Sequence, residues 1–135
     1  EDKLRVRHTI DLFASVGCRQ LDRYVSKFPD GRSVAVDAFS LRSWSGEVSW
    51  VNCDWDDLDR VAQRLEAEPK AAATVLCPYF PAELAFQRLH RMCSGMVVME
   101  WDPNWELRAE PNASGPLGPP EWNVAFVHIP ARGLA

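Results

Sequence analysis

Residues 54–78, DWDDLDRVAQRLEAEPKAAATVLCP, contain the pattern that decides the fold. Apolar residues recur here at i, i+3, i+4 and i+7, namely Leu58, Val61, Ala62 and Leu65. This spacing predicts a helix with one buried stripe. Asp54 is expected at its N-cap and Pro69 marks its end. The apolar run 73–77 then predicts a short buried strand, so a helix leads directly into a strand.

A second helix and strand follow in the same order. One face of the predicted helix carries apolar residues at helical spacing, namely Ala82, Ala85, Phe86, Leu89 and Cys93. Gly95 is expected to stop it, and residues 96–101 and 121–129 predict strands. Each strand–helix–strand step favours parallel neighbours joined by a right-handed crossover.

The first 52 residues predict a different arrangement. Residues 9–16 have apolar side chains on one helical face and are expected to form a short helix. Pro29-Asp30-Gly31 and residues 43–46 are typical of tight turns, so residues 21–52 predict an antiparallel three-stranded meander. The fold class is therefore α+β, with a mixed sheet on which the helices pack. The element order matches that of ribonuclease H-like folds, which is an analogy of element order and not a sequence resemblance.

Length and composition fit one domain spanning residues 1–135. The chain has 135 residues, 47% of them hydrophobic and 25% charged, which is ordinary globular composition. Residues 110–121 are rich in proline and glycine and predict an exposed loop. No signal peptide or membrane-spanning run is recognisable, so we expect a cytoplasmic protein, or one whose targeting segment has been removed.

Charge and cysteine spacing exclude several kinds of site. The formal net charge is −4, which disfavours nucleic acid as a partner, and the early arginines are interpreted as a solvated face. The four cysteines lack CxxC spacing, so they are expected to be free thiols and not zinc ligands. No glycine-rich phosphate loop occurs, and we predict neither a metal nor a cofactor.

Catalytic constellations are incomplete in the sequence. A ribonuclease H-like site needs clustered carboxylates; Asp22 and Asp59 could supply two, but the fourth strand ends without an acid. Other acids on or near strands are Asp37, Glu47, Glu100 and Asp102. A hydrolase is kept as an alternative, using such carboxylates or a pairing of His128 with Cys77 or Cys93. We predict no catalytic residue and lean against an enzyme.

Six tryptophans are the unusual feature of the composition. Three of them lie in or beside predicted turns with acidic neighbours, which suggests a binding surface made of Trp44, Trp55, Asp56, Trp105 and Glu106. The alternative is that these rings fold back over the sheet ends. The first interpretation predicts a non-catalytic domain that docks a protein, as an inhibitor or immunity-type protein or as an assembly module. A nucleic-acid-binding module is the third alternative.

Overall fold

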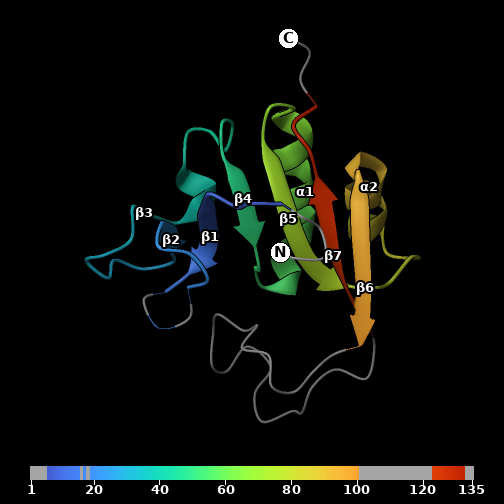
Figure 1. The fold of residues 1–135 in the computed structure, drawn as a ribbon, viewed down its shortest axis with the longest axis horizontal. Coiled ribbons are helices and arrows are strands. Elements are labelled where there is room, and N and C mark those ends of the chain that lie inside the picture. Colours follow the sequence, from blue (N-terminus) through green and yellow to red (C-terminus); the bar gives the residue numbers. More distant parts are fainter. Residues whose placement is uncertain (1–5, 16, 18, 101–122, 133–135) are drawn as a thin grey trace.

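The computed structural model describes residues 6–15, 17, 19–100 and 123–132, and these form one seven-stranded sheet with two helices packed on it (Figure 1). The α+β class with a mixed sheet is therefore confirmed. The elements in chain order are β1 (Ile10–Ala14), β2 (Tyr24–Ser26), β3 (Ala35–Val36), η1 (Ala38–Ser40), β4 (Val48–Val51), η2 (Trp55–Asp57), α1 (Leu58–Ala67), β5 (Ala72–Pro78), α2 (Leu84–Met92), β6 (Gly95–Glu100) and β7 (Asn123–Ile129).

The strand order is β3-β2-β1-β4-β5-β7-β6. β1 pairs in parallel with both β2 and β4, and the pairs β2–β3 and β4–β5 are also parallel. β7 lies between β5 and β6 and is antiparallel to both. All strands except β7 therefore run in one direction, and their carboxyl ends meet at one edge of the sheet (Figure 1).

The antiparallel meander predicted for residues 21–52 is wrong. β2 and β3 are parallel, and β4 pairs with β1 and β5, not with β3. The Pro29-Asp30-Gly31 turn exists, because the Asp30 carboxylate accepts the N–H groups of Arg32 and Ser33 at 3.0 and 2.9 Å. The turn lies inside a longer loop, which brings the chain back to the edge of the sheet where β2 begins, so that β3 can pair in parallel. The residues of a turn do not show whether the next strand pairs antiparallel or the chain first returns to pair in parallel.

The helix expected over residues 9–16 is also wrong, because Ile10–Ala14 is the strand β1. β1 lies between β2 and β4, so its backbone groups find partners on both sides. The register with β2 shifts between Asp11 and Ala14. A strand of five residues is too short to show a clear period of two, so the apolar side chains of residues 9–16 were interpreted as one face of a helix.

The two predicted helices and the strands that follow them are present. α1 joins the parallel neighbours β4 and β5, as predicted. α2 joins β5 to β6, but β7 is inserted between these strands, so they are parallel without being neighbours. Asp54 occupies the N-cap of the helical turn η2, which precedes α1, yet its side chain makes no capping hydrogen bond.

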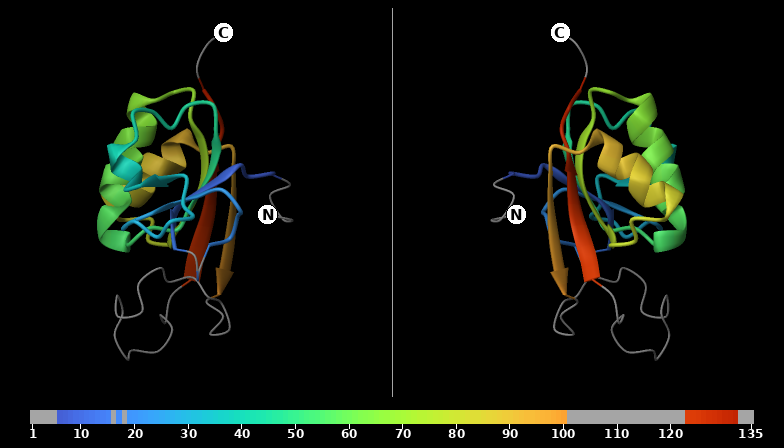
Figure 2. Two further views of the ribbon diagram at one scale, coloured as in Figure 1. Left: turned by 90° about the vertical axis from the view of Figure 1, so that its left-hand side faces the viewer. Right: turned by 90° about the vertical axis from the view of Figure 1, so that its right-hand side faces the viewer.

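Both helices lie on the same face of the sheet (Figure 2). The core lies between this face and the helices and includes Leu12, Val51, Val61 and Leu65, all 2% exposed or less. Neither helix is long and apolar enough to cross a membrane, a finding that covers the residues the structure describes. Residues 101–122, which include the proline-rich loop predicted at 110–121, lie outside the described residues.

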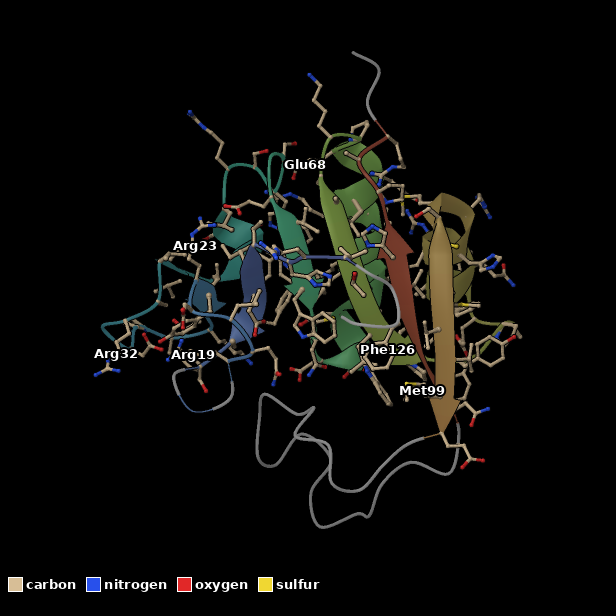
Figure 3. All side chains as sticks on the ribbon, viewed as in Figure 1. Arg19, Arg23, Arg32, Glu68, Met99 and Phe126 are labelled. Atoms are coloured by element: carbon tan, nitrogen blue, oxygen red, sulfur yellow. The ribbon has the colours of Figure 1, made fainter. Side chains whose placement is uncertain are left out.

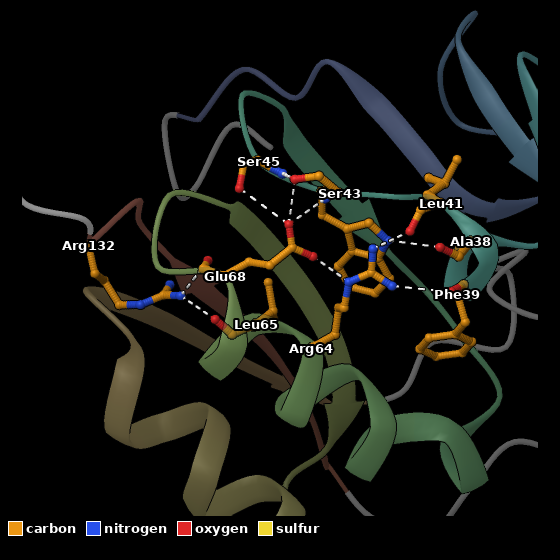
Figure 4. Close-up of polar contacts among 10 residues, drawn as sticks. Ala38, Phe39, Leu41, Ser43, Ser45, Arg64, Leu65, Glu68 and Arg132 are labelled. Carbon is orange, nitrogen blue, oxygen red and sulfur yellow. Dashed lines mark hydrogen bonds and ion pairs between the residues drawn. The ribbon is translucent and has the colours of Figure 1, made fainter.

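Glu68, just after α1, fastens the loop between β3 and β4 to the helix layer (Figure 4). Its carboxylate accepts hydrogen bonds from the Ser43 hydroxyl at 2.6 Å and the Trp44 N–H at 2.8 Å, and it pairs with Arg64. Arg64 also donates to the carbonyls of Phe39 and Leu41. The half-buried carboxylate of Glu68 thus holds the loop between β3 and β4 in place.

The pKa of Glu68 reflects this role. Burial alone would raise it, but hydrogen bonds from Ser43, Arg64 and the Trp44 N–H outweigh burial and lower the pKa to about 2. A carboxyl whose pKa is lowered on folding stabilises the fold above its unfolded value, near 4.5. That stabilisation disappears as the pH falls from 4.5 toward 2.

We predict that Glu68→Gln lowers the free energy of unfolding at pH 7 by about 2 kcal/mol, after allowing for solvent screening. The difference from the wild-type chain should shrink as the pH falls below 4.5, because the wild-type carboxyl then becomes protonated. Urea denaturation at several pH values measures both effects. Glu83→Gln, at the exposed N-cap of α2, is the matched control and should change little. A pH-independent loss in Glu68→Gln would contradict the prediction.

Candidate functional site

The predicted tryptophan surface does not come together among the described residues. Trp44 is 1% exposed, and its indole N–H donates to the Ala38 carbonyl at 2.9 Å. It belongs to the core, as does part of Trp55, which is half-buried and packs against the core cluster. Asp56 is exposed in η2. Trp105 and Glu106 lie outside the described residues.

The dispersed carboxylates do not gather into a ribonuclease H-like cluster. Asp22 is fully exposed and pairs with Arg19, whereas Asp59 lies on α1 and pairs with Arg88. Glu47 forms a two-pronged ion pair with Arg23, which lowers the pKa of Glu47. Two early arginines, at positions 19 and 23, are therefore neutralised locally (Figure 3). Glu100 is exposed at the end of β6, and Asp102 is outside the described residues.

A Cys–His nucleophile is not assembled from Cys77. Thr74 is opposite His128 and Cys77 is opposite Ala125 in the β5–β7 register, so His128 and Cys77 point to opposite faces of the sheet. Burial raises the pKa of the Cys77 thiol to about 12, which keeps it protonated. Among the described residues, no group of three metal-ligating side chains is close enough to hold an ion.

The strand order defines a different site. β1 leads toward β2 and β3 on one side, whereas β4 lies on its other side and leads toward β5. The chain therefore adds strands first on one side of β1 and then on the other, which places the switch point of the sheet between β1 and β4. In open sheets built of parallel strands, a crevice forms at such a switch point, outside the carboxyl ends of the strands, and ligands bind there.

A pocket of about 490 Å³ occupies this position. It is lined by the last residues of β1, the segment after β2, the residues that follow β3, and the start of the helical region after β4. Its size falls within the range typical of small-molecule sites. Four separate connections contribute walls to it, although they are far apart in the sequence.

Aromatic side chains form one part of the pocket wall. Phe13 and Phe39 meet edge to face with ring centroids 5.4 Å apart, and Phe28 lines the pocket with 67% of its surface exposed. The Arg60 guanidinium lies 3.9 Å from the centre of the Phe39 ring, and it is 3.7 Å from the Asp57 carboxylate. Flat apolar surfaces of this kind suit a stacked planar ring.

Acidic side chains dominate the polar part of the pocket wall. The pocket is lined by four aspartates against two basic residues, namely Asp30, Asp37, Asp54 and Asp57 against Lys27 and Arg60. Asp30 is committed to its own loop, where the Arg32 N–H and the Tyr24 hydroxyl lower its pKa to about 2. Asp54 and Asp57 make no capping hydrogen bond to the helical turns that they precede.

Asp37 holds a strained backbone at the edge of this pocket. Its φ of 64° and ψ of 101° lie in a region that side chains disfavour. It is the one non-glycine residue with positive φ in the part of the chain that the structure describes. The side chain accepts the Phe39 N–H at 3.1 Å and so starts η1, which brings Phe39 to the pocket. Strain of this kind concentrates at ligand sites.

Sequence reasoning missed this pocket because it depends on strand directions. Asp54 was interpreted only as a helix N-cap, and Asp37 was noted only as an acid on or near a predicted strand. The signal that could have located the site is that acids follow two consecutive strands, Asp37 after β3 and Asp54 after β4. That signal has meaning only when the two strands are parallel.

Comparison with protein-family models, with curated proteins and with solved structures found no match for this chain. The geometry described above is therefore the basis for a functional proposal.

We predict that glycine is better tolerated than alanine at position 37. Both substitutions remove the hydrogen bond to Phe39, but only glycine relieves the positive φ, so Asp37→Gly should be more stable than Asp37→Ala by about 1 kcal/mol. Chemical denaturation of the two variants measures the difference.

The matched control is the same pair of substitutions at Asp56, in the helical turn η2. There glycine should be the less stable variant by about 0.5–1 kcal/mol, because it loses more backbone entropy on folding. The same order at both positions would show that the backbone of Asp37 is not strained.

Proposed function

We propose that this chain binds a nucleoside-like small molecule, neutral or cationic, in the pocket between the ends of β1 and β4. The observation that carries the proposal is the position of the pocket, which spans the carboxyl ends of four parallel strands at the switch point. The volume of about 490 Å³ is sufficient for a nucleoside with a short substituent.

The charges in the pocket disfavour a phosphate-bearing ligand. Phosphates bind at helix N-termini, where free N–H groups and the helix dipole attract negative charge. Here the N-terminus of the helical region bears Asp54, Asp56 and Asp57. Their carboxylates would repel a phosphate. The sequence also has no glycine-rich loop that could wrap a phosphate group.

The same groups favour a ligand that donates hydrogen bonds. Ionised carboxylates are acceptors only, and those of Asp54 and Asp57 are not consumed by helix capping. Ribose hydroxyls and exocyclic amino groups are donors of the required kind. Phe13 and Phe28 offer apolar surface for a planar base. A positive charge on the ligand would gain further attraction from the excess of carboxylates.

We expect adenosine and a cationic nucleoside, S-adenosylmethionine, to bind more tightly than AMP or ATP, measured by isothermal titration calorimetry. Asp54→Asn and Asp57→Asn should each weaken binding of the tightest ligand about ten-fold, because each replaces a charged acceptor by a neutral one. Glu83→Gln, on α2 away from the pocket, is the control for a general effect of net charge.

Two results would contradict the proposal. The first is that none of the four compounds binds to folded protein at millimolar concentration. The second is that binding follows the phosphate count, with ATP the tightest, since the acidic wall would then not face the ligand. Equal weakening by Glu83→Gln and Asp54→Asn would assign the effect to net charge and not to the pocket.

Docking of a protein partner is the second candidate, and a specific observation favours it. Three apolar side chains along the β3 edge are exposed, Phe28 by 67%, Val34 by 54% and Val36 by 38%. Exposed apolar side chains on a short edge strand are typical of interaction surfaces. This surface differs from the predicted tryptophan surface. The free thiols of the described cysteines, Cys53, Cys77 and Cys93, support a reducing, cytoplasmic setting for either function.

For the docking candidate, we expect Val34→Lys to abolish recovery of any partner that the wild-type chain captures, because a lysine blocks edge pairing and apolar contact. Quantitative mass spectrometry of captured proteins measures this, with Val98→Lys on the opposite edge strand as control. Partners recovered equally by Val34→Lys would exclude the β3 edge as the docking surface.

A further inference from the structure

A buried polar chain crosses the sheet face opposite the helices. The His8 Nε2 lies 2.6 Å from the Thr74 hydroxyl oxygen, and the same oxygen lies 3.0 Å from the Nδ1 of His128. Thr74 is fully buried and His8 is 6% exposed. Residues 6–9, which we call the N-terminal strap, are attached to β5 and β7 through this chain, although 66 positions separate His8 from Thr74.

The strap covers aromatic surface on this face. The His8 ring meets Trp50 edge on with centroids 5.2 Å apart, and Trp50 packs against Phe126 at 5.9 Å. Figure 3 views the molecule from this side, with Phe126 labelled near the lower end of β7. The other end of the strap is held at Thr9, whose N–H donates to the Val48 carbonyl at 2.8 Å.

The number of hydrogens that the Thr74 hydroxyl can donate makes the His8–Thr74–His128 contacts sensitive to pH. A threonine hydroxyl has one hydrogen to donate, and it can donate to one histidine only if that histidine presents a bare ring nitrogen. Protonating that histidine converts its acceptor into a donor and leaves the buried hydroxyl hydrogen without an acceptor. Protonating both rings also places two positive charges on either side of one oxygen.

Among the described residues, no carboxylate contacts His128. Glu47, beside the strap, is held by Arg23 and by the Thr9 hydroxyl. Asp11 shares this face of the sheet, but its oxygens accept the N–H groups of Gln20 and Phe13. The neighbouring Arg7 is exposed and would add repulsion. Gly95 of β6, opposite His128, brings no charge.

We propose that the His8–Thr74–His128 chain is a proton-operated latch, which holds the N-terminal strap over Trp50 at neutral pH and releases it in mildly acidic conditions. The latch is independent of the switch-point pocket, because its residues lie on other strands and on the opposite face from the core.

The titration of His128 agrees with this direction. Burial lowers the pKa of His128 below 6.5, and the nearby His8 lowers it further, whereas a hydrogen bond with the Ala73 backbone raises it. A base whose pKa is lowered on folding favours the folded arrangement in its neutral form. The stabilisation is complete above pH 6.5 and is lost as the pH falls below that value.

Amide hydrogen exchange followed by NMR tests the latch in the full chain. After correction for the intrinsic pH dependence, protection of the Thr9 amide should fall at least ten-fold between pH 7.5 and pH 5.5, relative to amides of β5. His128→Gln should stay protected at both pH values, because an amide can bond to Thr74 but does not acquire a charge. His90→Gln, on the exposed side of α2, should behave as the wild-type chain.

A second measurement remains if His128→Gln does not fold. The chain has three histidines, so single variants assign their ring resonances. Removing the charge in His8→Gln should raise the titration midpoint of His128 toward 6.5. Equal protection of Thr9 at both pH values in the wild-type chain would overturn the proposal. So would a His128 midpoint that does not move in His8→Gln.

Discussion

Parallel pairing of β1 with β2 on one side and with β4 on the other is the constraint on which the rest of the structure depends. Because β1 is the neighbour of both β2 and β4, further strands are added to the sheet on both sides of β1. The carboxyl ends of four strands therefore converge at one edge, and the connections that leave them form the pocket. The Glu68 contacts to Ser43 and Trp44 fix the loop that enters β4, and thereby keep β4 beside β1.

The elements predicted best were those whose pattern is local. α1 and β5 follow directly from the spacing of Leu58 to Leu65 and from the apolar run 73–77, since burial of one stripe needs no information from the remainder of the chain. α2 and β6 were predictable for the same reason. β1 was mistaken for a helix because five residues, with a register shift among them, are too few to show a period of two.

The direction of short strands was not predictable in this way. β2 and β3 contain three and two residues. Whether they pair antiparallel or parallel depends on which strand β4 pairs with. The pairing of β4 with β1 and β5 joins residues far apart in sequence, such as Ile10 with Ser49 and Trp50 with Thr74. The pocket was not predictable for the same reason, because Asp37 and Asp54 line one pocket only when β1 and β4 lie side by side. Trp44 shows the converse error, since a residue predicted in a turn packs in the core against Phe13 and Phe39 and donates its indole N–H to Ala38.

The acidic pocket also has an energetic consequence for the fold. Asp37 holds a strained backbone at the edge of the pocket, and this strain costs folding free energy. Proteins retain such features where binding offsets them, and the remaining stability must come from elsewhere. Here it comes from the fully buried strand β5, from its long antiparallel pairing with β7 and from the helices on one face of the sheet. The contrast between the buried strand β5 and the strained backbone at Asp37 supports the proposal that the switch-point edge binds a ligand.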